Sequence, residues 1–251
     1  MAEPAALVEV DVADAPIPWL EVPGWRERYG VVAGITGRGP AAAPFDLGLA
    51  GSAPIGQVLD RWRSLRHPFP TGHGTVVARQ VHGTVVLWHT RVQGLAVHEG
   101  ADGHATAEPG LLLCVSAADC IPIYLVDPVR RAIAILHSGW RGTAAGILAS
   151  GVRALVEGAG SVRSDLVVHC GVGICGPCYR VGPPVAEACG TPGAGHVNLR
   201  AVIARQAVSE GVRSVTVSPH CSAHMNDRFM SHRGSQGLDG RMIAFLGLLP
   251  P

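Results

Sequence analysis

The chain has 251 residues, of which 47% are hydrophobic and 16% charged, so it carries enough apolar material for one large core. Its formal net charge is +1 and its arginines are scattered, which excludes the basic footprint of a nucleic-acid or membrane-surface binder and leaves a small molecule as the expected partner. All 20 basic residues are Arg, and the lack of Lys excludes enzymes that need a Schiff-base or phosphate-loop lysine.

Residues 1–30 form an N-terminal extension whose structure the sequence does not determine. The segment opens with MAEPAALVEV, which has acids where a secretion signal needs a basic region, so a cytoplasmic protein is expected. The longest apolar run, LLLCVSAADCIPIYLV, has 16 residues and is interrupted by Asp119, which makes it too short and too polar to cross a bilayer. The 7 cysteines are an odd number, and we expect free thiols, ligands or nucleophiles instead of a disulfide framework.

Short apolar runs predict strands along most of the remaining chain, and they outnumber the predicted helices. The expected strands lie at residues 31–36, 74–88, 111–116, 121–127, 131–138, 165–172 and 213–218. Apolar residues at helical spacing predict a helix over 143–158, and a second helix is expected from the N-cap Asn198 to a stop before Gly211. Since no repeat, linker or shift in composition interrupts residues 31–251, we expect a single catalytic domain there.

The segment HSGWRGTAAG, residues 137–146, places His137 at the end of a strand and Arg141 in a glycine-flanked loop before a helix. Helix amides and a fixed guanidinium together form an anion site, so a phosphate or carboxylate is the expected ligand. The alternative is that Arg141 is an ordinary surface charge and His137 a hydrogen-bonded core residue.

The segment ADCIPIY places Asp119 and Cys120 between two apolar runs, where a buried charge must be paired. Taken alone, Cys120 is best explained as a buried structural thiol. His82, in RQVHG before a possible turn, is likewise an ordinary structural or exposed histidine when taken alone.

These stretches occur together and in a fixed order, and together they resemble a known family. RQVHG, ADCIPI and HSGWRG look like the QVHG, ADCxPV and HAGWRG signatures of the YfiH-like family, whose members are also described as laccase-domain or multicopper polyphenol oxidase proteins. EGADGHAT, GICGPCYRVG, DRFMSHR and DGRM resemble further stretches of that family. The resemblance therefore covers the chain apart from roughly its first thirty residues, and ordered motifs of this length are far more specific than a lone glycine pattern.

The resemblance implies a single α+β domain with layers of helices outside mixed β-sheets, similar to the catalytic domain of cytotoxic necrotizing factors. It also implies that His82, Cys120 and His137 bind one zinc ion, and two imidazoles with one thiolate match a catalytic zinc site that keeps its fourth position open. Asp119 and Asp102 are then candidate general bases or carboxylates that support the ligands.

By the same resemblance, the function is phosphorolysis of the purine nucleosides adenosine, inosine and methylthioadenosine, with adenosine deamination as a second activity. The implied partners are a nucleoside and phosphate, bound by a monomer or weak homo-oligomer without nucleic acid or membrane. Phosphorolysis needs an anion pocket near the metal, and Arg141, Arg233 and Arg38 are the candidates for it.

Two other functions stay open. A copper-dependent polyphenol oxidase would need several copper ions with many histidine ligands, and the sequence has no His-x-His pair. A hydrolase acting on a cell-wall precursor would instead use Cys120 as nucleophile and His137 as base.

Cys175-Gly176-Pro177-Cys178 is the tetrapeptide with which thioredoxins exchange disulfides. Here it follows Ile174, where thioredoxins have Trp, and it does not follow an early strand of a small domain. The favoured interpretation is a packing turn beside the pocket with two inert thiols, and catalytic dithiol chemistry is the alternative.

Overall fold

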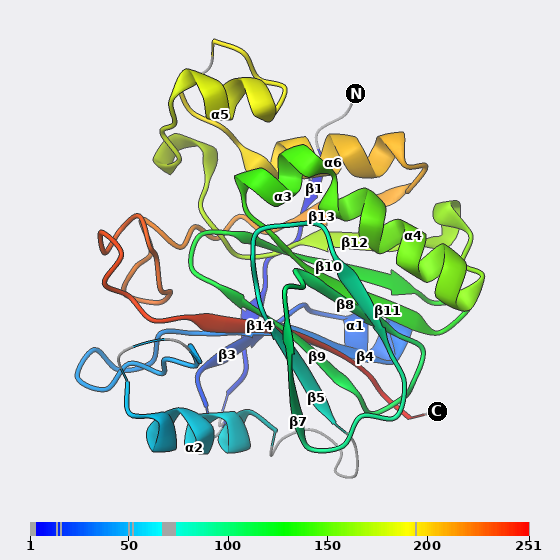
Figure 1. The fold of residues 1–251 in the computed structure, drawn as a ribbon, viewed down its shortest axis with the longest axis horizontal. Coiled ribbons are helices and arrows are strands. Elements are labelled where there is room, and N and C mark those ends of the chain that lie inside the picture. The colour runs from blue at the N-terminus through cyan, green and yellow to red at the C-terminus, as the bar shows by residue number, and fades with distance from the viewer. Residues whose placement is uncertain are drawn as a thin grey trace.

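The computed structural model describes residues 4–250 apart from 14, 16, 50, 52, 67–73 and 194. The chain folds into two seven-stranded mixed β-sheets packed face to face, with helices on their outer surfaces (Figure 1). In spatial order the first sheet consists of β1 (Ala5–Ala6), β13 (Ser214–Val217), β12 (Val167–Cys170), β10 (Ile121–Asp127), β11 (Ala132–Ser138), β8 (Gly103–Thr106) and β6 (Val86–His89). The second consists of β2 (Val10–Asp11), β3 (Trp19–Glu21), β4 (Val31–Thr36), β14 (Met242–Leu248), β9 (Leu112–Ala117), β5 (Thr75–Arg79) and β7 (Leu95–Glu99).

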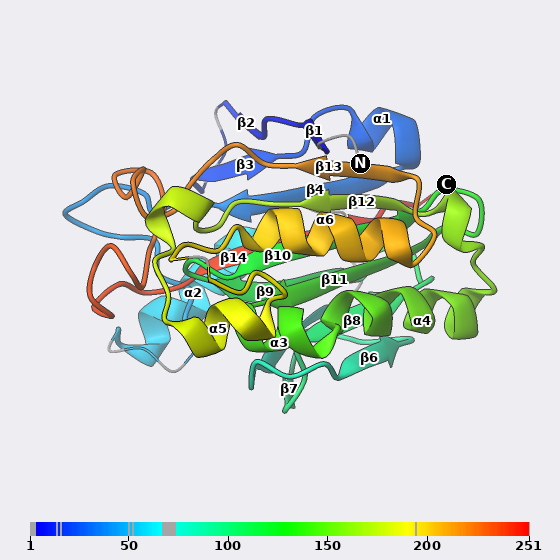
Figure 2. The ribbon, with the colours of Figure 1, turned by 90° about the horizontal axis from the view of Figure 1, so that it is seen from above.

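The helices form the outer layers (Figures 1 and 2). The α-helices of the described residues are α1 (Trp25–Tyr29), α2 (Ile55–Arg66), α3 (Trp140–Ala145), α4 (Ile147–Ala159), α5 (Pro183–Ala188) and α6 (Leu199–Ser209), with short 3-10 helices η1 (Arg163–Asp165) and η2 (Gly176–Cys178). Apolar side chains of α4 and α6 pack on the first sheet, and those of α2 pack on the second. The α+β class with helices outside mixed sheets, predicted from the sequence, is therefore confirmed.

The central core lies between the two sheets. Tyr124 and Ile135 of the first sheet belong to one buried cluster with Leu113 and Ala244 of the second. All seven residues of β10 are buried, because helices cover one face of this strand and the second sheet covers the other. A strand covered on both faces has a continuous apolar sequence, which is why the run over 121–127 predicted it.

Both helices predicted from the sequence are present, and the first is divided. Gly146 ends α3 and begins α4, and its φ of 84° lies in the left-handed region that glycine tolerates best. Helix α6 begins after Asn198, whose side chain accepts a hydrogen bond from the backbone N–H of Ala201, and it ends before Gly211 as predicted.

The N-terminal segment is an integral part of both sheets. Strand β1 pairs with β13 of the first sheet, and β3 pairs with β4 of the second. Residues 1–3, 14 and 16 of this segment lie outside the described residues. Glu9 anchors the segment, because its buried carboxylate forms hydrogen bonds with the His169 ring and the Ser218 hydroxyl.

Glu9→Gln should destabilise the fold by about 1.5–3 kcal/mol at neutral pH, the usual range for hydrogen bonds to a charged group. Burial on its own would raise the pKa of Glu9, but the hydrogen bond and charge of His169, together with Ser218, lower it below its usual value of 4.5. A carboxylate with a depressed folded-state pKa contributes stability above its unfolded-state pKa and loses that contribution as the pH falls. Urea unfolding at about pH 7 and about pH 3.5 tests this prediction, and a difference between variant and wild type that does not shrink at the lower pH would contradict it.

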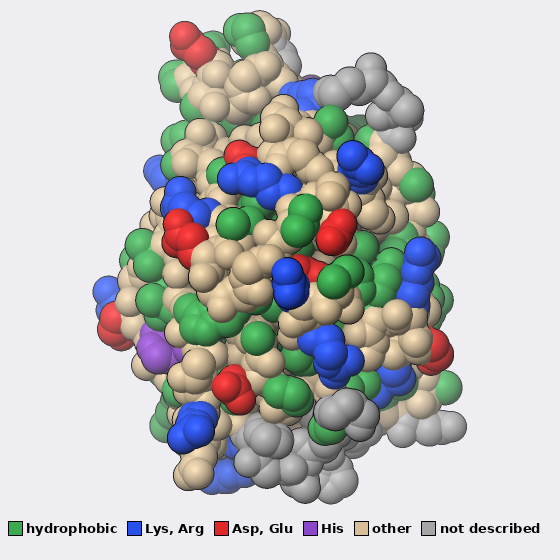
Figure 3. All heavy atoms as spheres, turned by 90° about the vertical axis from the view of Figure 1, so that its right-hand side faces the viewer, with side chains coloured by type: hydrophobic (Ala, Val, Ile, Leu, Met, Phe, Trp, Pro, Cys, Tyr) green, Lys and Arg blue, Asp and Glu red, His purple; other side chains and the backbone are tan. Residues whose placement is uncertain are grey.

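The surface agrees with the scattered charge of the sequence. On the face shown in Figure 3, arginine and acidic side chains are interspersed, and no patch of one sign covers it. None of the helices in the described parts of the chain has the length and apolar character needed to cross a membrane.

Candidate functional site

Three chain segments bring His82, Cys120 and His137 to one edge of the sheets. His82 follows β5, Cys120 immediately precedes β10, and His137 is in the last turn of the pleat of β11. Strands β10 and β11 are antiparallel with Ile121 opposite Ser138, so the start of one strand lies beside the end of the other. One donor atom from each of the three residues lies within 4.8 Å of the other two. The three side chains therefore form a group that can hold a single metal ion.

Gly139 makes this close approach possible. A Cβ atom at this position would lie 2.9 Å from the Cys120 sulfur and 3.0 Å from Cδ2 of the His82 ring, both too short for a side chain. His82 itself has a φ of 61°, an uncommon conformation for a residue with a side chain. The local backbone is thus strained so that the imidazole can face the thiol, as often occurs at functional sites.

Asp102 orients His137. Its fully buried carboxylate bonds to Nδ1 of His137 at 2.9 Å and accepts the backbone N–H groups of residues 81–83 at 3.2, 2.9 and 2.7 Å. Burial would raise the pKa of Asp102, but the hydrogen bond to His137 and those from the backbone lower it, so it stays ionised. Because Nδ1 is taken by Asp102, Nε2 is the nitrogen of His137 that is available as a ligand.

The thiol and the imidazole stabilise each other's charged forms. Burial on its own would raise the pKa of Cys120, but the charge of His137 and hydrogen bonds with His137 and His82 lower it to about 6. Burial would lower the pKa of His137, whereas the charge of Cys120 and the hydrogen bond with Asp102 raise it to about 9. Cys120 is therefore a thiolate at neutral pH, which is the form that binds metals and attacks electrophiles.

The donor set fits zinc. Zinc binds thiolate and imidazole together, and three protein ligands leave one position for a substrate. The carboxylate behind His137 is the usual outer partner of a zinc-bound histidine. The three residues implied by the sequence resemblance, together with Asp102, thus have the chemistry that such an ion requires.

The group opens into a cleft of about 930 Å³ whose walls include Arg141 and Arg233. Both side chains are exposed, and each guanidinium lies over an aromatic ring, 4.5 Å from the centre of Trp140 and 5.3 Å from that of Tyr179. Among the described residues, no carboxylate forms an ion pair with either arginine. Two unneutralised positive charges therefore border the cleft beside the donor group.

The other predicted site residues have structural partners. Asp119, with a φ of 88°, accepts hydrogen bonds of 2.6 Å from the hydroxyls of Ser222 and Ser231 and from the backbone N–H of Arg233. Its charge is thus satisfied without Arg141. Arg38 forms an ion pair with Asp239 and donates to the carbonyl of Phe229, so its charge is already neutralised.

A second group of donors was missed by the sequence reasoning. Cys175 and Cys178 lie with Cys221 and His224, and the four donor atoms are all within 4.8 Å of one another. The interpretation of 175–178 as a packing turn with two inert thiols is therefore incomplete, since these thiols share a cluster with residues far along the chain. The available signal was the second pair, Cys221-x-x-His224, which repeats the spacing of the first.

Comparisons with known proteins connect this geometry to a family. The family described as "Multi-copper polyphenol oxidoreductase laccase" matches residues 37–249. The purine nucleoside phosphorylase YlmD of Geobacillus stearothermophilus is 32% identical over 259 residues, which cover 91% of this chain and 94% of that protein. The adenosine deaminase RL5, from an unknown prokaryotic organism, is 31% identical over 181 residues, 63% of this chain and 69% of that protein.

The likeness extends to the fold. The crystal structure of YlmD from Geobacillus stearothermophilus matches with a TM-score of 0.84 at 28% identity, covering 96% of this chain and 100% of that one. A match along most of the sequence, joined to one of nearly full length in space, confirms the resemblance that the ordered motifs indicated. The chain belongs to the multi-copper polyphenol oxidoreductase laccase family, the YfiH-like proteins.

Proposed function

We propose that the protein is a zinc-dependent purine nucleoside phosphorylase that acts on adenosine, inosine and methylthioadenosine and also deaminates adenosine. The observation that carries the proposal is the convergence of His82, Cys120 and His137 at a cleft bordered by the unpaired guanidiniums of Arg141 and Arg233. The relatives named as purine nucleoside phosphorylase and adenosine deaminase support both activities.

Each residue of the site has a distinct task in this proposal. His82, Cys120 and His137 would hold the zinc, which when bound supplies Lewis-acid catalysis. Asp102 keeps the proton on Nδ1 of His137, so the ring stays in the orientation and tautomer that a ligand needs.

The cleft has the size and chemistry for a nucleoside and phosphate. Its volume of about 930 Å³ is within the usual range for small-molecule sites. Trp140 and Tyr179 contribute aromatic surface suited to a purine, while Arg141 and Arg233 contribute charge suited to a phosphate. Binding both reactants side by side lowers the entropic part of the barrier.

Asp102→Asn is expected to lower the zinc affinity of this site by about 10- to 100-fold, the usual effect of losing the carboxylate behind a ligating histidine. The amide must place an NH₂ group among donors that now face a carboxylate, so His137 loses its support. Competition with a chromogenic chelator measures the affinity. Asp165→Asn, at an exposed carboxylate outside the cleft, is the matched control, and an affinity equal to that of the control would contradict the role of Asp102.

The proposed function is tested by metal analysis combined with a nucleoside screen. With phosphate, zinc-loaded protein should release the free base and ribose 1-phosphate from adenosine and inosine, and the corresponding products from methylthioadenosine. Without phosphate, adenosine should still give inosine. Copper binds the same nitrogen and sulfur donors, so activity that returns with copper and not with zinc would replace zinc by copper. No base release from any of the three nucleosides would refute the phosphorylase.

One observation favours a hydrolase as the second candidate. Cys120, His137 and Asp102 are arranged as nucleophile, base and orienting carboxylate, and the thiol pKa of about 6 suits a cysteine nucleophile. Such an enzyme would form a bond between the Cys120 sulfur and a substrate acyl carbon. It would need no metal, which distinguishes it from the first proposal.

A further inference from the structure

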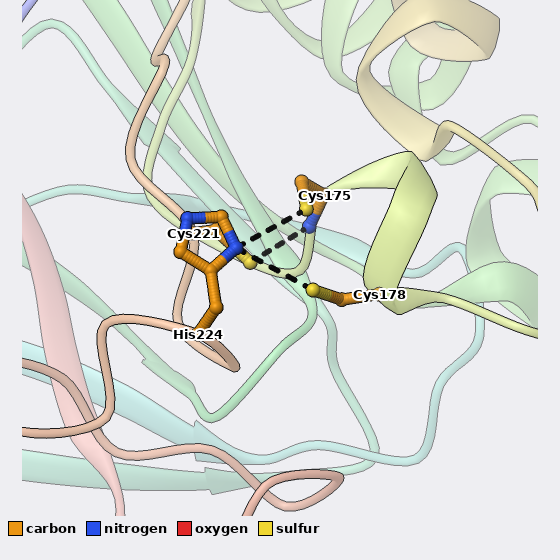
Figure 4. Close-up of side chains that lie close together, drawn as sticks. All are labelled: Cys175, Cys178, Cys221 and His224. Atoms are coloured by element: carbon orange, nitrogen blue, oxygen red, sulfur yellow. Dashed lines mark hydrogen bonds between the residues drawn. The ribbon is translucent and has the colours of Figure 1, made fainter.

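Two neighbouring strands place four metal-binding side chains together outside the site described above. Cys175 and Cys178 follow β12 and flank η2, and Cys221 and His224 lie in the turn after β13. Strands β12 and β13 are parallel, so both loops leave the first sheet at the same edge. Figure 4 shows the three thiols and the imidazole pointing toward one another.

The distances within the cluster match those around a tetrahedral zinc ion. Bond lengths of about 2.0 Å to nitrogen and about 2.3 Å to sulfur place the two kinds of donor about 3.5 Å apart. Nδ1 of His224 lies 3.7 Å from the sulfur of Cys175 and 3.4 Å from that of Cys178. The backbone N–H of Cys175 also points at the sulfur of Cys221 at 3.2 Å, as commonly occurs for sulfur atoms that carry thiolate charge at a metal.

The number and type of donors indicate a structural site. Three sulfurs and one nitrogen complete a tetrahedron, whereas a catalytic zinc keeps a position open. The Cys-x-x-Cys and Cys-x-x-His pairs have the short spacing of such sites. All three cysteines are free thiols in the structure, and a disulfide between any two would leave the third without a partner. We propose that Cys175, Cys178, Cys221 and His224 bind a second, structural zinc ion.

This ion would brace the loop that carries Cys120. Ile174, next to Cys175, donates its backbone N–H to the carbonyl of Asp119 at 2.9 Å. Ser222, next to Cys221, donates its hydroxyl to the carboxylate of Asp119 at 2.6 Å. Each half of the cluster is therefore one residue from a hydrogen bond to Asp119, which directly precedes Cys120. Zinc would fix the two halves relative to each other and hold Asp119 between them.

Zinc analysis of two sets of variants tests the second site independently of the first. We expect purified His82→Ala/His137→Ala protein to keep about one zinc per chain, because the four ligands of the second site are intact. Adding Cys178→Ser and His224→Ala to that protein should remove this zinc. Cys189→Ala, at a buried cysteine in neither group, should not remove it, and His224→Cys should retain it because four thiolates also bind zinc.

X-ray absorption at the zinc edge of the His82→Ala/His137→Ala protein decides the ligand set even where the larger variant fails to fold. Three sulfurs at about 2.3 Å and one nitrogen at about 2.0 Å support the proposal. A metal-free protein, a shell with one sulfur or none, or a disulfide among the three cysteines overturns it. Because these measurements do not involve nucleosides, they hold whether or not the proposed phosphorylase activity is found.

Discussion

Cys120→Ser is expected to lower kcat/KM for phosphorolysis by at least about 1000-fold, a loss of about 4 kcal/mol of transition-state stabilisation. The thiolate is the one anionic donor in the group, and a serine hydroxyl stays neutral at the pH where Cys120 is ionised. The substitution therefore weakens zinc binding as well as the charge balance around His137. Kinetics with zinc quantified on the same preparation measure the effect, and Cys189→Ser, a buried cysteine outside both donor groups, should keep activity within a few-fold.

Cys120→Asp distinguishes a metal ligand from a nucleophile. Aspartate is also a zinc ligand, so the variant should retain zinc at this site and regain at least about tenfold over Cys120→Ser if the thiolate holds the metal. It cannot replace a sulfur that must form a thioester. Equal inactivity of the two variants, in protein whose wild-type activity resists removal of zinc, would favour the hydrolase and contradict the zinc enzyme.

Strong local signals explain the elements that the sequence predicted correctly. Strands β10 and β11 are continuous apolar runs because both of their faces are covered, and α6 has an N-cap whose side chain bonds to the helix as expected. These signals depend on residues close in sequence, so they survive without knowledge of the tertiary structure.

Elements that depend on distant neighbours were not predicted. Strand β8, with the sequence Gly-His-Ala-Thr, has little strand character of its own and is extended because β11 and β6 flank it. The two-residue strands β1 and β2 similarly exist only through their pairing with β13 and β3. The division into two sheets and their strand orders are non-local, and no pattern along the chain specifies them.

The candidate site divides in the same way. Its three donors were proposed through a family resemblance, since each looks ordinary when taken alone. The part of Asp119 emerged only in three dimensions, because Ser222 and Ser231 lie more than a hundred residues from it. Cys175 and Cys221 are 46 residues apart, so their cluster also depended on the pairing of β12 with β13.

Arg141→Ala is expected to cost phosphorolysis about 1.5–3 kcal/mol, a 10- to 150-fold loss, which is the range for a charge-assisted hydrogen bond. Arg141 is exposed, borders the cleft close to His137, and has no ion-pair partner among the described residues, so its charge is available to a phosphate. Deamination uses water in place of phosphate and should lose clearly less. Both rates are measured on one preparation of the variant, with zinc content determined in parallel.

The competing explanation is that Arg141 braces the fold, in which case both activities and the zinc content would fall together. The structure argues against this, because Asp119, the carboxylate most in need of a partner, is satisfied by two serine hydroxyls and the backbone N–H of Arg233. Removing the guanidinium leaves its stacking on Trp140 as the main lost contact. Arg141→Lys keeps a positive charge at the cleft and should recover part of the phosphate affinity, which a packing role would not explain. Equal losses in the two reactions would contradict a phosphate-specific role for Arg141, whereas a raised KM for phosphate at unchanged zinc content is the result that the geometry favours.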